Sequence, residues 1–126
     1  MTAKSVEELQ IWQSALRFAA AVLAATGRTE LSRTLRLRDQ IEMAADSILA
    51  NVAEGFEQGS DRAFARYLFI ARGSCSEVRA HLDVARMKGL LTEGEAEQLR
   101  EDAADLMRQT TGFIRYLLRS DRKRRV

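Results

Sequence analysis

The sequence predicts an all-α protein, folded as an antiparallel up-and-down four-helix bundle. Apolar residues recur at helical spacing over four long segments, no proline interrupts these segments, and short connections containing glycine separate them. At 126 residues the chain has the size of a single domain, residues 1–126. Short connections between long helices favour antiparallel neighbours, which gives the bundle.

The first two helices are expected over residues 5–26 and 30–57. Ser5 and Glu8 have the spacing of a capping box, in which each side chain binds the other residue's free backbone donor. This pair is therefore expected to start the first helix. The second helix ends in a segment with two glycines, residues 55–59.

The last two helices are expected over residues 60–88 and 92–120. Ser60 is positioned as the N-cap of the third helix, and Gly89 is placed to end that helix in the left-handed conformation. Thr92, with a glutamate three residues later, forms a second capping box and opens the fourth helix.

Each helix of a four-helix bundle buries one apolar stripe. The second and fourth helices show single stripes of this kind. These are Leu37, Ile41, Ala45, Ile48 and Val52 in the second helix, and Leu99, Ala103, Leu106, Thr110, Phe113, Ile114 and Leu117 in the fourth.

The first and third helices carry two apolar stripes each and need a second surface to bury. The stripes assigned to the core are Leu9, Trp12, Leu16, Ala19 and Leu23, and Phe64, Ala71, Cys75, Val78 and Leu82. The other apolar residues are predicted to form an interface between copies of the chain, because exposed apolar patches of this extent mark interfaces. They are Ile11, Phe18, Val22, Phe69, Ile70, Val84 and Met87. The alternative is a monomer with a few exposed apolar side chains.

The composition excludes several classes of protein. One cysteine, Cys75, allows no disulfide within the chain, and one histidine, His81, excludes a two-histidine zinc site and the di-iron pattern of ferritin-like bundles. The longest uncharged apolar run has eight residues, whereas a membrane-spanning helix needs about 20. Because no signal-peptide pattern is found either, we expect a soluble cytoplasmic protein that does not bind membranes.

No motif for catalysis or cofactor binding is found. The sequence has no glycine-rich phosphate loop, dinucleotide fingerprint or catalytic triad motif, and Glu54 has no suitably spaced partner for acid–base work. Glu77 and His81 are interpreted as a surface pair, and Cys75 as a small buried apolar group. We therefore expect no enzyme, no metal and no cofactor.

The C-terminal segment is strongly basic. Residues 115–126 carry six basic residues and one acidic residue, a net charge of +5, and arginine accounts for 17 of the 20 basic residues of the chain. Such a segment is suited to phosphate backbones. The residues predicted to contact RNA or DNA are Arg115, Arg119, Arg122, Lys123, Arg124 and Arg125. The alternative for residues 119–126 is a solvated, frayed tail.

Two internal motifs resemble a known family. Residues 47–55 read Ser-Ile-Leu-Ala-Asn-Val-Ala-Glu-Gly, residues 67–77 contain Ala-Arg-Gly-Ser-Cys-Ser-Glu, and Leu-Gln-Ile-Trp opens the region at residues 9–12. Together they resemble the bacterial four-helix-bundle family encoded in intervening sequences of 23S rRNA genes, related to the accessory variability determinant proteins of diversity-generating retroelements. The motif residues with a structural role are Ser47, Asn51, Glu54, Gly55, Gly73, Ser74 and Glu77.

The motif residues have interpretations of their own. Ser47, Asn51 and Glu54 are interpreted as part of a hydrogen-bond network that ties helix ends or neighbouring subunits together, the alternative being a polar pocket. Gly73 is interpreted as a point of close helix approach or a slight kink, the alternative being a binding notch.

The resemblance implies a ring-shaped homopentamer with no known catalytic activity and, for most members, no defined molecular function. For the retroelement relatives it implies binding of nucleic acid and a reverse transcriptase through basic surface. This chain has Glu42-Met43 and Gln58 where the family often has arginines, which argues against nucleic-acid binding through the second helix. Two hypotheses follow. The chain is a non-enzymatic oligomer that binds nucleic acid, or it is a protein-interaction scaffold that does not.

Overall fold

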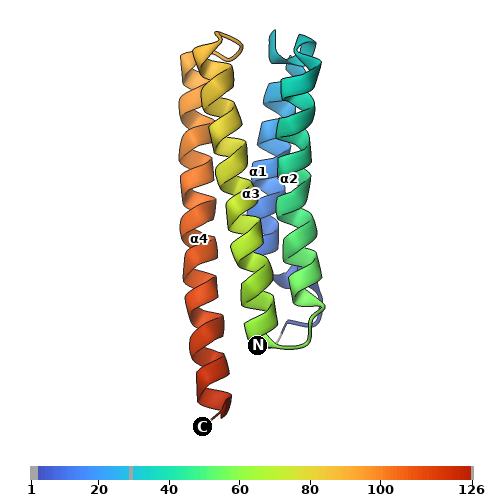
Figure 1. The fold of residues 1–126 in the computed structure, drawn as a ribbon, viewed down its shortest axis with the longest axis vertical. Coiled ribbons are helices and arrows are strands. Elements are labelled where there is room, and N and C mark those ends of the chain that lie inside the picture. Colours follow the sequence, from blue (N-terminus) through green and yellow to red (C-terminus); the bar gives the residue numbers. More distant parts are fainter. Residues whose placement is uncertain (1–2, 29, 126) are drawn as a thin grey trace.

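The computed structural model describes residues 3–28 and 30–125 and shows four long α-helices, with no strand in that part of the chain. The helices are α1 (Gln10–Arg28), α2 (Leu35–Phe56), α3 (Asp61–Met87) and α4 (Glu93–Arg125). Consecutive helices pack side by side and α4 also packs on α1, so α1 and α3 lie on one diagonal of the bundle and α2 and α4 on the other (Figure 1). No described helix is long and apolar enough to span a membrane.

The first helix starts later than predicted. Residues Val6–Glu8 form a short 3₁₀ helix, η1, and Leu9 is extended, with φ −77° and ψ 130°. The Ser5 side chain makes no capping hydrogen bond. The Glu8 carboxylate accepts instead from the backbone N–H of Lys4 at 2.7 Å. The capping box predicted here is therefore wrong, because the carboxylate binds a different backbone donor.

The second helix is also preceded by a 3₁₀ segment. Residues Glu30–Arg33 form η2, and α2 begins at Leu35 rather than at residue 30. The side chain of Leu31 in η2 is fully buried, and η2 packs against α1 and α2. This buried leucine anchors the connection between the two helices.

The caps predicted for α3 are present. The Ser60 hydroxyl accepts from the backbone N–H of Ala63 at 3.2 Å. At the other end Gly89 has φ +73°, and the N–H of Leu90 donates to the carbonyl of Ala85 at 2.9 Å. This 6→1 bond, with the left-handed glycine, is a Schellman motif.

The fourth helix starts as predicted and ends later. The N–H of Glu95 donates to the Thr92 hydroxyl at 3.1 Å, as a capping box requires. The helix continues to Arg125, so residues 119–125 are helical rather than a frayed tail. Its last turns project beyond the other three helices (Figure 1).

The stripes predicted for α2, α3 and α4 form the core, with Phe113 half-buried and the others buried. The stripe predicted for the first helix is partly wrong. Leu16 and Leu23 are 44% and 43% exposed, whereas Ile11, Phe18 and Val22 are 5%, 4% and 0% exposed. The last three therefore lie in the core of the chain itself and are not available for the predicted interface.

The exchange reflects which face of α1 is turned toward α2 and α4. That face carries Phe18 among small residues such as Ala15 and Ala19, and the phenyl ring fills the space beside them. The leucines at positions 16 and 23 lie at the edge of that face. Both stripes of α1 have helical periodicity, so periodicity alone does not show which of the two is buried.

The backbone of α2 approaches α3 closely at Gly55. A Cβ atom at this position would lie 2.8 Å from Cδ1 of Phe64 and 2.8 Å from Cβ of Tyr67. Gly73, by contrast, is exposed, and a Cβ atom there would meet nothing within 4 Å. The close approach predicted at Gly73 is therefore wrong, and Gly55 makes it instead.

We expect Gly55→Ala to lower the free energy of unfolding by about 1–3 kcal/mol, because the new methyl group overpacks the α2–α3 contact. The matched control Gly73→Ala should raise the free energy of unfolding by up to about 1 kcal/mol, since alanine favours a helix interior. Urea denaturation followed by circular dichroism measures both. Equal effects of the two substitutions would contradict this account.

Candidate nucleic-acid interface

Three motif residues, Ser47, Asn51 and Ser74, form a hydrogen-bonded network between α2 and α3, whereas Glu54, which was predicted to belong to it, does not. The hydroxyls of Ser47 and Ser74 lie 2.8 Å apart. The side-chain amide of Asn51 donates to the carbonyl of Ser47 at 2.8 Å and to its hydroxyl at 3.1 Å. Because Ser47 and Ser74 are on different helices, this network fixes the register of α2 against α3.

The acidic motif residues lie at the surface. Exposed Glu54 accepts from the side-chain amide of Gln58 at 3.2 Å. Exposed Glu77 lies 3.9 Å from Nε2 of His81, one turn along α3. Among the described residues, no group of three or more His, Cys, Asp or Glu side chains could hold a metal ion. Glu54 and Glu77 therefore lie in contact with solvent, and each pairs with a residue four positions later in the chain.

The thiol of Cys75 is fully buried and donates to the carbonyl of Ala103 at 3.6 Å. Burial raises the pKa of Cys75 to about 11, an effect that the nearby charge of Arg79 partly opposes. The group is therefore a neutral thiol at physiological pH and acts as a packing element between α3 and α4.

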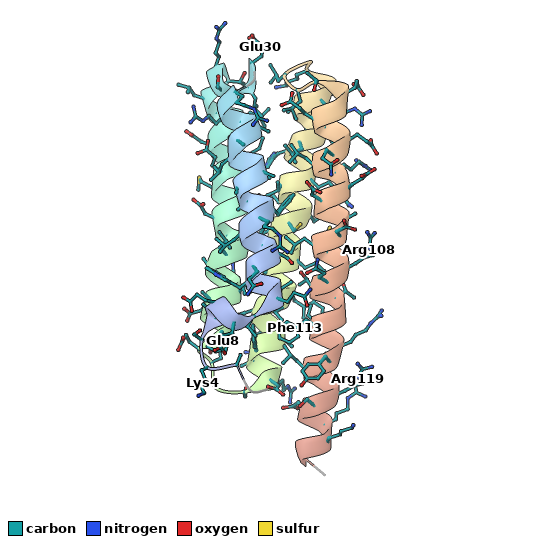
Figure 2. All side chains as sticks on the ribbon, turned by 180° about the vertical axis from the view of Figure 1, so that it is seen from behind. Lys4, Glu8, Glu30, Arg108, Phe113 and Arg119 are labelled. Carbon is teal, nitrogen blue, oxygen red and sulfur yellow. The ribbon has the colours of Figure 1, made fainter. Side chains whose placement is uncertain are left out.

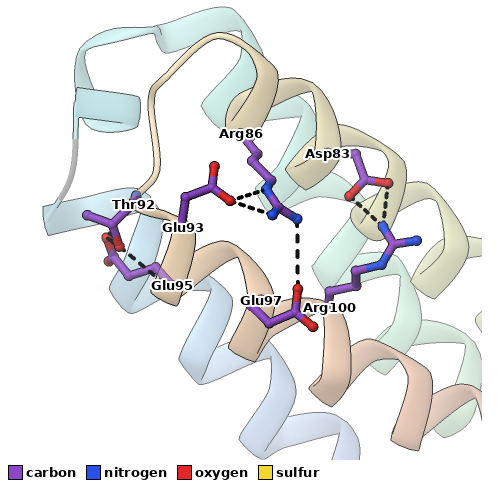
Figure 3. Close-up of polar contacts among 7 residues, drawn as sticks. All are labelled: Asp83, Arg86, Thr92, Glu93, Glu95, Glu97 and Arg100. Carbon is purple, nitrogen blue, oxygen red and sulfur yellow. Dashed lines mark hydrogen bonds and ion pairs between the residues drawn. The ribbon is translucent and has the colours of Figure 1, made fainter.

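Charges are paired where α3 ends and α4 begins. Arg86 donates to the carboxylate of Glu93, with Nε at 2.8 Å, and lies 3.8 Å from Glu97 (Figure 3). Arg100 contacts both carboxylate oxygens of Asp83, at 2.8 and 2.9 Å. The hydrogen bond from Arg86 lowers the pKa of Glu93. Arg86 and Arg100 are thus neutralised by nearby acids.

The opposite end of the bundle is different. Arg115, Arg119, Arg122 and Lys123 are exposed on the last turns of α4, and among the described side chains none of these four forms an ion pair. The side chains of Arg124 and Arg125 lie outside the described residues, although their backbone is helical.

Two further arginines, which the sequence analysis did not predict as nucleic-acid contacts, lie at the same end. Arg62 and Arg66 are exposed on the first turns of α3, which runs antiparallel to α4. Their spacing of four residues, on one helix face, was the available signal. We call the set of described cations on α3 and α4 at this end the basic end. It consists of Arg62, Arg66, Arg115, Arg119, Arg122 and Lys123.

Most acidic side chains at this end belong to other elements. The exposed acids are Glu7 and Glu8 on η1 and Glu54 and Glu57 at the end of α2, which packs on α3 and is diagonal to α4. Asp61 on α3 is buried, and Asp121 on α4 is half-buried. Figure 2 shows Glu8 and Arg119 on opposite sides of this end. The exposed acids therefore lie on elements other than α4, which leaves the α4 side of this end positive.

Comparison with known families shows which family the chain belongs to. The pattern of the family described as 23S rRNA-intervening sequence protein matches residues 7–112. The chain belongs to this family. A similar fold is found in a crystal structure described as a protein with unknown function from the S23 ribosomal protein family of Bacteroides thetaiotaomicron VPI-5482. Its sequence is 20% identical to this chain, and the TM-score is 0.74. The similarity covers 82% of this chain and 97% of that one, and it shows the shared fold.

The search of functionally curated proteins gave no significant match. The 23S rRNA-intervening sequence family match contains Gly55 and the Ser47–Ser74 network, but it ends before Arg115. The α4 part of the basic end thus lies outside the region that the family pattern describes. It is a feature of this chain that the family name does not account for.

We expect Cys75 to react with a thiol reagent far more slowly in the folded chain than in urea, because the thiol is buried and protonated.

The pKa of Cys75 is higher in the folded chain than in the unfolded chain. The thiol therefore stabilises the fold at a pH below its unfolded-state pKa, and this stabilisation is lost as the pH rises through its folded-state pKa. The stability advantage of wild type over Cys75→Ala should therefore shrink by about 2–3 kcal/mol between about pH 8 and pH 11. Denaturation at a series of pH values measures it, and a pH-independent difference would contradict the assignment.

Proposed function

We propose that this member of the 23S rRNA-intervening sequence family is a non-enzymatic protein that binds nucleic acid through its basic end. The observation that carries the proposal is the separation of charge at that end. Arg115, Arg119 and Arg122 are exposed and have no ion-pair partner among the described side chains, while the exposed acids of the same end lie on η1 and at the end of α2.

The chemistry of the basic end is suited to phosphate. Guanidinium groups donate bidentate hydrogen bonds to phosphate oxygens, and the projecting turns of α4 are accessible from several directions. Such contacts are largely independent of sequence and strongly dependent on salt. The chain resembles the accessory variability determinant proteins, and this resemblance implies that those proteins bind nucleic acid through a basic surface. It therefore supports the same proposal.

The second helix does not offer an equivalent surface. Arg38 donates to the carboxylate of Glu42 at 2.7 Å, so this acid neutralises a cation on α2. At position 42 this chain has a glutamate where the family often has an arginine. We therefore place the proposed binding surface on α3 and α4 rather than on α2.

The triple variant Arg115→Ala, Arg119→Ala, Arg122→Ala should bind a structured RNA and a duplex DNA more weakly, because three phosphate contacts are removed. The slope of log K against log salt, measured by fluorescence anisotropy between about 50 and 200 mM salt, should become shallower by about three. The matched control Arg28→Ala, Arg33→Ala, Arg36→Ala removes the same charge at the opposite end and should change neither quantity.

Two results would count against nucleic-acid binding through the basic end. Equal loss in the two triple variants would indicate a general charge effect. No binding by the wild-type chain at about 50 mM salt would favour the alternative, a protein-interaction scaffold, since electrostatic binding is strongest at low salt.

The proposal also includes self-association. Leu16 and Leu23 are exposed on α1, with Ala20 and Ala24 on the same face, and we call these four residues the α1 stripe. On α3 an exposed or half-exposed set also faces outward, and we call it the α3 stripe. It consists of Phe69, Ile70, Gly73, Val84 and Met87.

The positions of these stripes favour a head-to-tail contact. Because α1 and α3 are diagonal, the two stripes lie on opposite sides of the bundle. Two different patches on opposite sides allow one copy to bind the next in the same way, which closes a ring when the rotation permits. The resemblance to a homopentameric family supports a ring. In this proposal Leu16 and Leu23 replace the buried Ile11, Phe18 and Val22.

Leu23→Glu and Phe69→Glu should each reduce the oligomer to smaller species, because each places a charge in one half of the contact. The control Met43→Glu, at a 71% exposed position of α2 outside both stripes, should keep the wild-type mass in light scattering. A mixture of Leu23→Glu and Phe69→Glu should form a dimer, since one intact contact remains between unlike copies. A monomeric wild-type chain at micromolar concentration would overturn the assembly.

A further inference from the structure

An open pocket lies between the start of α1 and the later turns of α4. Its volume is about 520 Å³, which is within the range of small-ligand sites, roughly 300–1,000 Å³. Its lining includes buried apolar side chains, exposed amides and two aromatic rings. The lining residues include Leu9, Gln10, Ile11, Gln109, Phe113 and Tyr116.

The tyrosine in this pocket is held in place but accessible. The Tyr116 ring stacks on Phe113, with centroids 6.1 Å apart and an interplanar angle of 23°. Phe113 in turn makes an edge contact with the buried ring of Phe64, with centroids 5.4 Å apart. The row of rings anchors Tyr116 to the core, while 46% of Tyr116 remains exposed. Its ring is therefore a preorganised surface for stacking.

Cations follow directly along the same helix face. Arg119 and Lys123 are three and seven residues after Tyr116, so they occupy the next turns on that face, and both are exposed. Figure 2 shows Phe113 directed toward the bundle and Arg119 directed outward, near the end of α4. An aromatic platform followed by cations fits a ligand that has both a flat ring and phosphates.

We propose that this pocket takes one unpaired base of a single-stranded nucleic acid. The base stacks on Tyr116, and the phosphates that flank it contact Arg119 and Lys123. This inference rests on the proposed function and narrows it to a class of substrate. Bases in a duplex are stacked and paired and do not reach such a pocket, so a single strand binds better than a duplex.

The amides at the pocket add contacts with the base edge. Within the described part of the chain, the side chains of Gln10 and Gln109 make no hydrogen bond, and each carries a donor group and an acceptor group. They come from different helices, at the two sides of the pocket. Stacking on an aromatic ring accepts every base, so the site tolerates many sequences.

The test uses the full chain and a labelled RNA strand of about 12 nucleotides, alone and paired with its complement. Tyr116→Leu keeps an apolar side chain but removes the ring, and it should weaken binding of the single strand by about 5- to 100-fold. The matched control Tyr116→Phe keeps the ring and should bind within about twofold of wild type. Binding of the duplex should not change in either variant.

The outcomes separate this inference from the function on which it rests. Equal binding of the single strand by wild type and Tyr116→Leu, with the salt dependence intact, would overturn the base pocket and leave the proposed function standing. Absence of binding to either RNA by the wild-type chain at about 50 mM salt would overturn the proposed function itself. Thermal unfolding of both variants at the wild-type temperature would show that a loss of binding is not a loss of fold.

Discussion

The contact of Gly55 with α3 is the constraint on which the rest of the structure depends. Only a residue without a side chain allows α2 to approach Phe64 and Tyr67 so closely. The ring of Phe64 is thereby fixed, it orients Phe113 on α4, and Phe113 supports Tyr116. A packing requirement between two neighbouring helices thus determines the geometry of the aromatic surface on a third helix.

The unequal lengths of α3 and α4 give the basic end its character. With 27 residues in α3 and 33 in α4, the last turns of α4 have no neighbouring helix and need no apolar face. Cations near a helix C-terminus also interact favourably with the helix dipole, so the arginines of α4 have a structural benefit. Arg62, in the first turn of α3, has no such benefit, because the dipole there favours acidic residues. Its presence at the same end is better explained by a binding surface.

Much of this fold could be predicted from local sequence signals. The caps at Ser60, Gly89 and Thr92 depend on residues within one turn, and the core stripes of α2 to α4 follow from periodicity. The exchange of stripes on α1 could not be predicted, because it depends on which face of α1 packs against α2 and α4, and both faces have helical periodicity. The same holds for the pocket, since Gln10 and Gln109 are far apart in sequence and meet only when α4 packs on α1.

The proposed assembly and the proposed binding site are compatible because they use different surfaces. The proposed contacts between copies involve the outward faces of α1 and α3, from the middle of these helices to the end opposite the basic end, whereas Tyr116 and Arg119 lie in the later turns of α4. A ring closed through the sides of the bundle places every basic end on the same rim. Several weak sites on one rim act together on a long strand through their effective concentration. In the proposed ring, the exposed tyrosines and cations of several chains act on one strand together, so the proposal does not require a large interface on each subunit.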